Sequence, residues 1–133
     1  MNRVVITGMG AITPLGNTVT EFWDGIKNGK NGIAAITNFD ASETGISVAG
    51  EVKDFDATKY MDRKEYKRMD LFSQYAVAAS AQAVEQSGID MDKIDSDRFG
   101  VTIGSGVGGF MTMESGIIKM HEKGPKRVPP MFV

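Results

Sequence analysis

The chain has 133 residues, of which 41% are hydrophobic and 24% charged, an ordinary composition for one globular domain. The formal net charge of −2 argues against bulk nucleic-acid binding, which needs a large positive excess. Because the chain contains no cysteine, it cannot form a disulfide, a thiolate metal site, an iron–sulfur cluster or a thiol nucleophile. Its single histidine, His121, cannot build a multi-histidine metal site. No apolar run is long enough to span a membrane and no targeting segment is recognisable, so we expect a cytoplasmic protein.

Two apolar segments predict buried β-strands. Residues 4–7 are β-branched and are followed by Gly8, so they predict a strand close to the start of the chain. Residues 99–103 predict a second strand, which leads into a run of glycines. A further short strand is expected near residues 46–52, in an otherwise irregular stretch.

Three helical segments accompany these strands. Thr18 or Thr20 can cap a helix that runs to about Lys27. The strongest helical pattern covers residues 62–87, with charged residues in its first part and five alanines spread over every face of its second part. Because a helix that is apolar on all sides is buried on all sides, we expect it to pack between two other layers. Residues 110–123 predict an amphipathic helix, and the order strand, helix, helix, strand, helix is typical of an α/β fold.

The last residues of the sequence are apolar. The chain finishes on Pro129, Pro130, Met131, Phe132 and Val133, without a polar tail. A parallel sheet whose last helix is followed by no further strand leaves a sheet edge and a helix face uncovered. We therefore expect this sequence to be part of a longer protein.

The glycine-rich run from Gly104 to Gly109 formally matches the pattern G-x-G-x-x-G. It lies between a predicted strand and a predicted helix, as in dinucleotide-binding loops. However, the acidic residue expected about 20 positions further on is missing, because Pro129 and Pro130 occupy that region. Nucleotide binding is therefore the less favoured interpretation. The alternative is that the glycines let the backbone pass close to another layer or to a ligand.

Four cations lie within six residues of the long predicted helix: Arg63, Lys64, Lys67 and Arg68. The pairs 63/67 and 64/68 are spaced i,i+4, so on one helix their charges repel along one face. A solvated surface and a docking patch for an acidic partner both explain such a face. A looser cluster of His121, Lys123, Lys126 and Arg127 is interpreted as part of the surface. His121 lies near the C-terminal end of a predicted helix, where the helix dipole favours a cation.

Three stretches together resemble the β-ketoacyl-[acyl carrier protein] synthases, most closely the bacterial elongating type. They are residues 3–17, with RVVITGMG and TPLGN, residues 99–109, with FGV and IGSGVGG, and residues 126–133, with KRVPPMFV. The resemblance covers the whole chain, but members of the family are far longer. Residues 1–133 are therefore expected to be the amino-terminal part of the family's N-terminal domain.

The resemblance implies a thiolase-like α/β fold of five layers, α-β-α-β-α, which is incomplete in this chain. The alanine-rich helix fits the central layer. It also implies fatty acyl elongation by decarboxylative Claisen condensation with malonyl-acyl carrier protein, in a homodimeric acyltransferase. The substrates are then carried on the phosphopantetheine of acyl carrier protein, and no other cofactor is expected. Two alternatives stay open: a non-catalytic carrier-protein-binding module and, less favoured, a nucleotide-binding domain.

The resemblance also implies roles for particular residues. The family's catalytic cysteine and its two histidines match no residue here, so no catalytic residue is assigned to this chain. Lys64, Lys67 and Arg68 match basic positions that meet the acidic helix of the carrier protein. Val107 matches a residue that lines the acyl pocket, and Phe132 matches one that reaches the pocket of the other subunit. The alternative is that Val107 and Phe132 are ordinary core residues.

Overall fold

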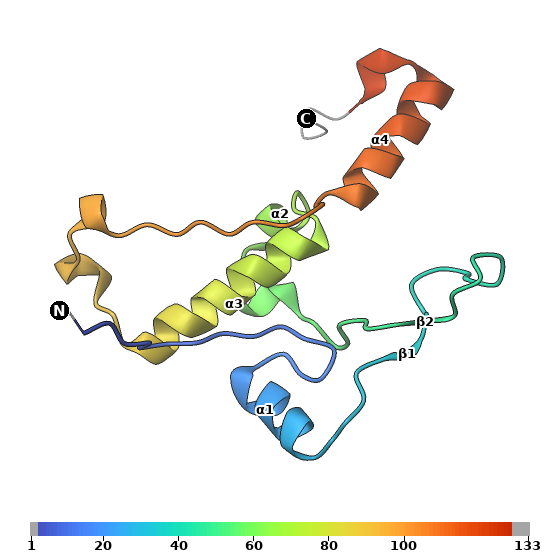
Figure 1. Cartoon of the computed structure of the whole chain (residues 1–133). Coiled ribbons are helices and arrows are strands. Elements are labelled where there is room, and N and C mark those ends of the chain that lie inside the picture. The colour runs from blue at the N-terminus through green and yellow to red at the C-terminus, as the bar shows by residue number, and fades with distance from the viewer. Residues whose placement is uncertain (1–2, 129–133) are drawn as a thin grey trace.

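The structure is a computed structural model and describes residues 3–128 of the chain. At its centre is helix α3 (Leu71–Ser87), and one extended segment runs along each of two sides of this helix (Figure 1). The first segment is the N-terminal part of the chain, and the second leads from residue 99 to helix α4. The remaining elements are, in chain order, α1 (Val19–Lys27), β1 (Ala34–Ala35), β2 (Val48–Ala49), η1 (Ala57–Lys59), α2 (Arg63–Tyr66), η2 (Met91–Lys93), η3 (Ser96–Arg98), α4 (Phe110–Lys123) and η4 (Pro125–Arg127).

Helix α1 confirms the first predicted helix and its cap. The hydroxyl of Thr18 accepts a hydrogen bond from the backbone N–H of Glu21 at 3.2 Å, so Thr18 is the N-cap. The Glu21 carboxylate in turn accepts from the backbone N–H of Asn17 at 2.8 Å. The first of these bonds satisfies an N–H group that the first turn of a helix leaves without a partner, and the second ties the residue before the N-cap to that turn. The helix ends at Asn28 and is followed by Gly29 at φ +62°.

The predicted single helix over residues 62–87 is wrong, because the structure divides it into α2 and α3. The break is built around Gln74, which is buried although it is polar. Its side-chain amide donates to the carbonyl of Tyr66 at 3.0 Å and to that of Met69 at 2.8 Å, so carbonyls that no helix uses find a donor. Asp70 then starts α3 with extended backbone angles, and Asp is among the preferred residues at that position. Gly88, at φ +64°, ends α3 where the sequence predicts.

The N-terminal segment packs closely on α3 through two glycines. A Cβ atom at Gly8 would overlap the carbonyl oxygen of Ala83, and one at Gly10 would overlap that of Ala79. Between them, the backbone N–H of Met9 donates to the side chain of Gln86 at 2.7 Å. Small residues on both surfaces therefore bring the two backbones into contact, as the alanine-rich pattern predicts. The expectation that this helix is buried on all sides is not met within residues 3–128, where Val77 is 37% exposed.

The two predicted buried strands are not β-strands in the described part of the chain. Residues 4–7 and 99–103 are extended, but within residues 3–128 neither segment forms a β-ladder, and Ile6 is 82% exposed. A strand needs a hydrogen-bonded neighbour, and none of the described residues supplies one. The sheet that is described pairs β1 with β2 in antiparallel fashion, and β2 lies inside the predicted strand over 46–52.

Helix α4 confirms the last predicted helix. It starts after Gly109, at φ +70°, and ends at Gly124, at φ +83°. Many of its apolar side chains face solvent, Phe110 among them. Met61 and Ala78 are the buried apolar residues of the described chain, so most of the core of an α/β fold is not built within it. No helix within residues 3–128 combines the length and the apolar character that crossing a lipid bilayer requires.

Candidate functional site

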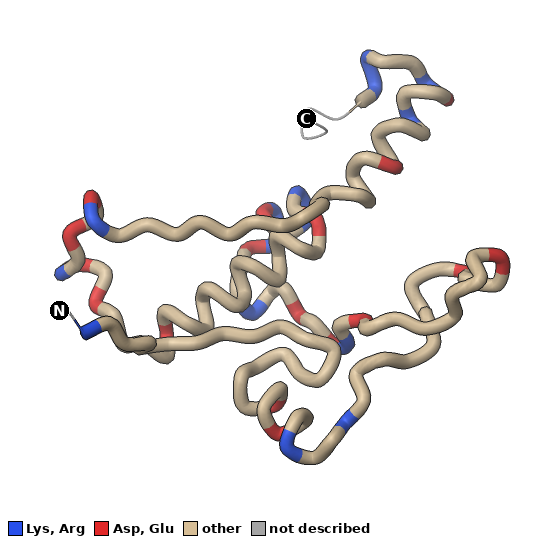
Figure 2. The backbone as a smooth tube through the Cα atoms, viewed as in Figure 1, with Lys and Arg blue, Asp and Glu red and all other residues tan. Residues whose placement is uncertain are grey.

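The basic residues predicted to form a docking patch lie in and just after α2. Arg63, Lys64, Lys67 and Arg68, here called the α2 patch, are all exposed. The ion pairs among residues 3–128 are Lys27 with Asp24 and Lys93 with Asp90, so none of them involves the α2 patch. In Figure 2, basic and acidic positions lie side by side around α2 and the start of α3. Four exposed cations that take part in no ion pair of the described residues leave their charge available to an acidic partner.

The geometry of the α2 patch differs from the expected stripe along one long helix. Helix α2 ends at Tyr66, and Lys67 and Arg68 belong to the turn that leads to α3. In this turn the backbone N–H of Arg68 donates to the carbonyl of Glu65 at 2.9 Å. The charges are therefore spread over a helical turn and a loop, and they do not stack along one continuous helix face.

The glycine-rich run forms a turn between the second extended segment and α4. Gly108 lies against the aromatic ring of Phe72, and a Cβ atom there would be 2.8 Å from two ring carbons. This contact confirms that a glycine of the run brings the backbone close to another layer. Val107, the residue predicted to line an acyl pocket, is 64% exposed at the tip of the turn. Phe132, the other predicted pocket residue, lies outside the described residues.

A hollow of about 530 Å³ joins the glycine-rich turn to the α2 patch. Arg68 of the α2 patch borders it on one side, and Ser105 and Gly108 of the turn border it on another. Between them lies Asp70, whose carboxylate accepts a hydrogen bond from the hydroxyl of Thr112 at 2.5 Å. The structure thus brings one of the three predicted docking residues next to the turn that carries Val107, although Val107 itself does not line this hollow.

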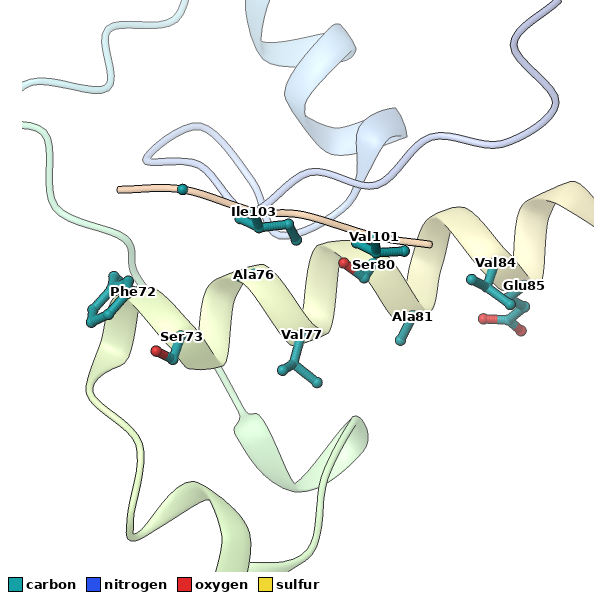
Figure 3. Close-up of a pocket in the computed structure, with 11 residues that line it drawn as sticks. Phe72, Ser73, Ala76, Val77, Ser80, Ala81, Val84, Glu85, Val101 and Ile103 are labelled. Carbon is teal, nitrogen blue, oxygen red and sulfur yellow. The ribbon is translucent and has the colours of Figure 1, made fainter. Parts of the chain in front are cut away.

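A second and larger hollow, of about 790 Å³, follows the side of α3 (Figure 3). The extended segment with Val101 and Ile103 runs along the helix here, beside Ala76 and Ser80 (Figure 3). Its lining is predominantly apolar and it is open to solvent. Its volume falls in the range of small-molecule sites, roughly 300–1,000 Å³, but an open groove does not enclose a ligand as such sites do.

The C-terminal end of α4 carries a second group of cations. Lys119, Lys123 and Arg127 border a hollow of about 610 Å³. His121, in the last turn of α4, and Lys126 are exposed nearby, as the interpretation of this cluster as surface predicts. Sequence reasoning missed Lys119, although its i,i+4 spacing from Lys123 on a predicted helix was a signal that could have found it.

The groups with a shifted pKa belong neither to the glycine-rich turn nor to the α2 patch. Hydrogen bonds from the hydroxyl and backbone N–H of Thr37 lower the pKa of Glu51, and those from Thr58 lower the pKa of Asp56. Burial raises the pKa of Tyr75. Nowhere between residues 3 and 128 do three His, Asp or Glu side chains gather as a metal site would need. The features of interest are therefore a basic surface, a glycine-rich turn and the hollow between them.

Comparison with known proteins gives a consistent picture. The family described as "Beta-ketoacyl synthase, N-terminal domain" matches residues 1–133. The chain is 48% identical over 131 residues to a 3-oxoacyl-[acyl-carrier-protein] synthase 2 of Synechocystis sp. and 47% identical over 131 residues to one of Vibrio harveyi. Each of these alignments covers 98% of this chain and 32% of the relative. The chain thus spans about a third of the length of the curated relatives it matches.

Solved structures show the same likeness. A β-ketoacyl synthase from Burkholderia phymatum superposes with a TM-score of 0.78 at 32% sequence identity, over 99% of this chain and 33% of that one. A chain from the complex of a type II PKS acyl-carrier protein with its ketosynthase superposes with a TM-score of 0.78 at 30% identity. The superposition covers 98% of this chain and 34% of that one. The elements described above are thus arranged as in part of a ketosynthase.

Proposed function

This chain belongs to the β-ketoacyl synthase family, and from that membership we propose that it is the amino-terminal part of a 3-oxoacyl-[acyl carrier protein] synthase. The observation that carries the proposal is the 48% identity to a synthase of this name over 98% of the chain. Residues 1–133 form the first part of the N-terminal domain. The complete protein elongates fatty acyl chains with malonyl-acyl carrier protein in the cytoplasm, as a homodimer.

The proposed reaction is a decarboxylative Claisen condensation. A cysteine thiolate first takes the acyl group from acyl carrier protein as a thioester. Malonyl-carrier protein then loses carbon dioxide, and the carbanion attacks the thioester carbonyl and expels the thiolate. Two histidines assist the decarboxylation, and backbone N–H groups stabilise the developing oxyanion. This chain has no cysteine and one histidine, so these catalytic groups belong to the rest of the complete protein.

The proposed task of this chain is to receive the carrier protein and to shape the acyl site. Lys64, Lys67 and Arg68 dock the acidic carrier, whose phosphopantetheine delivers the substrate without a further cofactor. Support comes from their exposure and from the absence of ion pairs at the α2 patch within residues 3–128. Val107 lines the acyl pocket, and Phe132 reaches the pocket of the partner subunit.

Two further functions are less well supported. A stand-alone carrier-binding module would leave large apolar side chains such as Phe110 and Met111 in water, which soluble monomers rarely do on this scale. Nucleotide binding through Gly104 to Gly109 is disfavoured because Gly108 packs against Phe72, so a close approach within the protein already explains that glycine.

The experiment that tests the proposal compares the complete protein with residues 1–133 alone. Each is purified and incubated with an acyl-carrier protein and malonyl-carrier protein, and the product is identified by its mass. We expect 3-oxoacyl-carrier protein from the complete protein and none from residues 1–133. Absence of product from the folded complete protein would refute the proposed function, and product from residues 1–133 would refute the assignment of the catalytic groups.

A further inference from the structure

Asp70 takes part in the start of two helices at once. By its backbone it is the N-cap of α3, yet its side chain makes no capping hydrogen bond to that helix. The carboxylate turns toward α4, where one oxygen accepts from the hydroxyl of Thr112 at 2.5 Å. These two residues are 42 positions apart in the sequence, so their bond joins separate parts of the fold.

The beginning of α4 has no side-chain cap of its own. Its N-cap is Gly109, which has no side chain and lies at φ +70°. Thr112 is the third residue of the helix, and its hydroxyl holds the Asp70 carboxylate beside the first turn. A negative charge is favourable there, because the N-terminal end of a helix carries a partial positive charge. Asp70 therefore places a carboxylate beside the start of α4, although it accepts no backbone N–H of that helix among the hydrogen bonds of the described residues.

The second carboxylate oxygen of Asp70 lies in a buried position beside the glycine-rich turn. It is buried and accepts no hydrogen bond from any described residue. It also lies 3.4 Å from the place that a Cβ atom of Gly109 would occupy. A buried acceptor without a donor is unfavourable and is retained only where its surroundings hold it in place. The hydrogen bond from Thr112 to the other oxygen is therefore what holds the carboxylate beside the end of the glycine-rich turn.

The glycine-rich turn is fixed on one side and open on the other. At its C-terminal end, a Cβ atom at Gly108 would overlap the ring of Phe72, and one at Gly109 would lie 3.4 Å from the carboxylate of Asp70; both neighbours belong to the start of α3. At its N-terminal end, a Cβ atom at Gly104 or Gly106 would meet nothing within 4 Å. The position of Val107, between these two ends, therefore depends on the contacts at Gly108 and Gly109.

We propose that Asp70, through its hydrogen bond to Thr112, is a positioning residue that places Val107 and thereby sets the length of acyl chain that the enzyme accepts. This inference rests on the proposed function, because it uses the assignment of Val107 to the acyl pocket. Asp70 does not act on the reacting atoms. Asp70 fixes the position at which the glycine-rich turn continues into α4, and this turn positions the side chain of Val107, which borders the substrate.

The test is made in the complete synthase that contains this chain. Thr112→Val removes the donor and keeps the size of the side chain, whereas Thr112→Ser keeps the hydroxyl. Ser115→Ala is a matched control on the same helix, since the Ser115 hydroxyl bonds only to the carbonyl of Thr112 among the described residues. For each variant, kcat/KM is measured with a series of acyl-carrier substrates from short to long, together with the melting temperature.

We expect Thr112→Val to change the ratio of kcat/KM for long and short chains by about threefold to tenfold. A small displacement of the turn alters the pocket less than a whole methylene does, and a methylene is worth roughly tenfold or more in an apolar pocket. Thr112→Ser and Ser115→Ala should keep the wild-type ratio. A lower melting temperature alone would not change this ratio, so the ratio separates a positioning role from a purely structural one.

A second variant keeps the test decisive if Thr112→Val does not fold. In Asp70→Ser the new side chain is a preferred N-cap for α3, but its hydroxyl is too short to reach Thr112 in place of the carboxylate, so this variant should change the ratio in the same way. An unchanged ratio in folded Thr112→Val or Asp70→Ser, or loss of folding in both, would overturn the inference. If Val107→Phe alters the chain-length profile while these variants do not, the inference fails and the proposed function stands. Inactive wild-type protein would instead count against the proposed function.

Discussion

The ring of Phe72 occupies the space that a side chain at Gly108 would need. We therefore expect Gly108→Ala to destabilise the complete protein by about 1–3 kcal/mol, the usual range for an overpacked site. The matched control is Gly106→Ala, in the same turn, where a Cβ atom meets nothing within 4 Å. Thermal unfolding of the two variants checks this. Equal melting temperatures for both would show that the ring moves aside without cost.

A charge reversal tests the α2 patch. In the complete protein, Lys64→Glu combined with Lys67→Glu should raise KM for carrier-bound substrate, because an acidic carrier is then repelled. Exposed ion pairs are worth about 0.2–1 kcal/mol each, so Lys64, Lys67 and Arg68 together can contribute roughly 0.6–3 kcal/mol. The effect should weaken as salt screens the charges.

Two controls accompany the charge reversal. Acyl groups on small thiols do not use the carrier surface, so their KM should stay close to that of the wild type. Lys30→Glu reverses an exposed charge outside the α2 patch and should leave both substrates unaffected. If the double variant lowers activity equally with carrier-bound and small-thiol substrates, the patch is structural and the docking assignment is wrong.

Enlarging Val107 tests the acyl pocket. We expect Val107→Phe in the complete protein to block long acyl chains, since overpacking a filled site typically costs about 1–3 kcal/mol. Short primers, which do not reach that depth, should react almost normally. Rates are measured with primers of increasing length. A uniform loss over all lengths, or a lower melting temperature alone, would instead identify Val107 as an ordinary core residue.

The pH dependence of stability should report on Glu51. Its carboxylate accepts from the hydroxyl of Thr37 at 2.7 Å and from the backbone N–H of Thr37 and Asn38, and these bonds hold its pKa below the ordinary 4.5. A lowered pKa means that this stabilisation is present at neutral pH and is lost as the pH falls through the folded-state pKa. The melting temperature of Glu51→Gln should therefore lie below that of the wild type at pH 7 and approach it in acid. A difference that persists unchanged in acid would contradict this assignment.

Local signals in the sequence were sufficient for most helix boundaries. Thr18 and Gly88 fix ends of α1 and α3 through bonds and backbone angles within a few residues, so both ends could be predicted. The break between α2 and α3 could not, because it is stabilised by Gln74, a residue several positions inside the second helix. Asp70 was the local sign of a new helix start, but it follows closely on the charged run that ends at Arg68 and therefore resembles a continuation of that run.

The site could be predicted in composition and only partly in arrangement. Exposure of Lys64 and Lys67 follows from their charge, and a close approach at the glycine-rich run follows from the lack of side chains. That Phe72 is the residue approached, and that Thr112 bonds to Asp70, depends on packing between segments distant in the sequence. Residues 4–7 and 99–103 likewise have the composition of strands, but a β-ladder needs a hydrogen-bonded neighbour, and none of the described residues supplies one.

The glycines that face α3 also align the N-terminal segment in a single register. Two residues of extended chain advance about 6.6 Å, and one turn of four helical residues advances about 6 Å, so the two repeats nearly match. Gly8 accordingly meets Ala83, and Gly10 meets Ala79, one turn earlier. Sliding the segment by one residue would bring the long side chain of Met9 to a position against α3 where only the hydrogen atom of a glycine fits. The two close approaches thus fix the position of the N-terminal segment along α3. They thereby also fix where the chain leaves α3 toward α1.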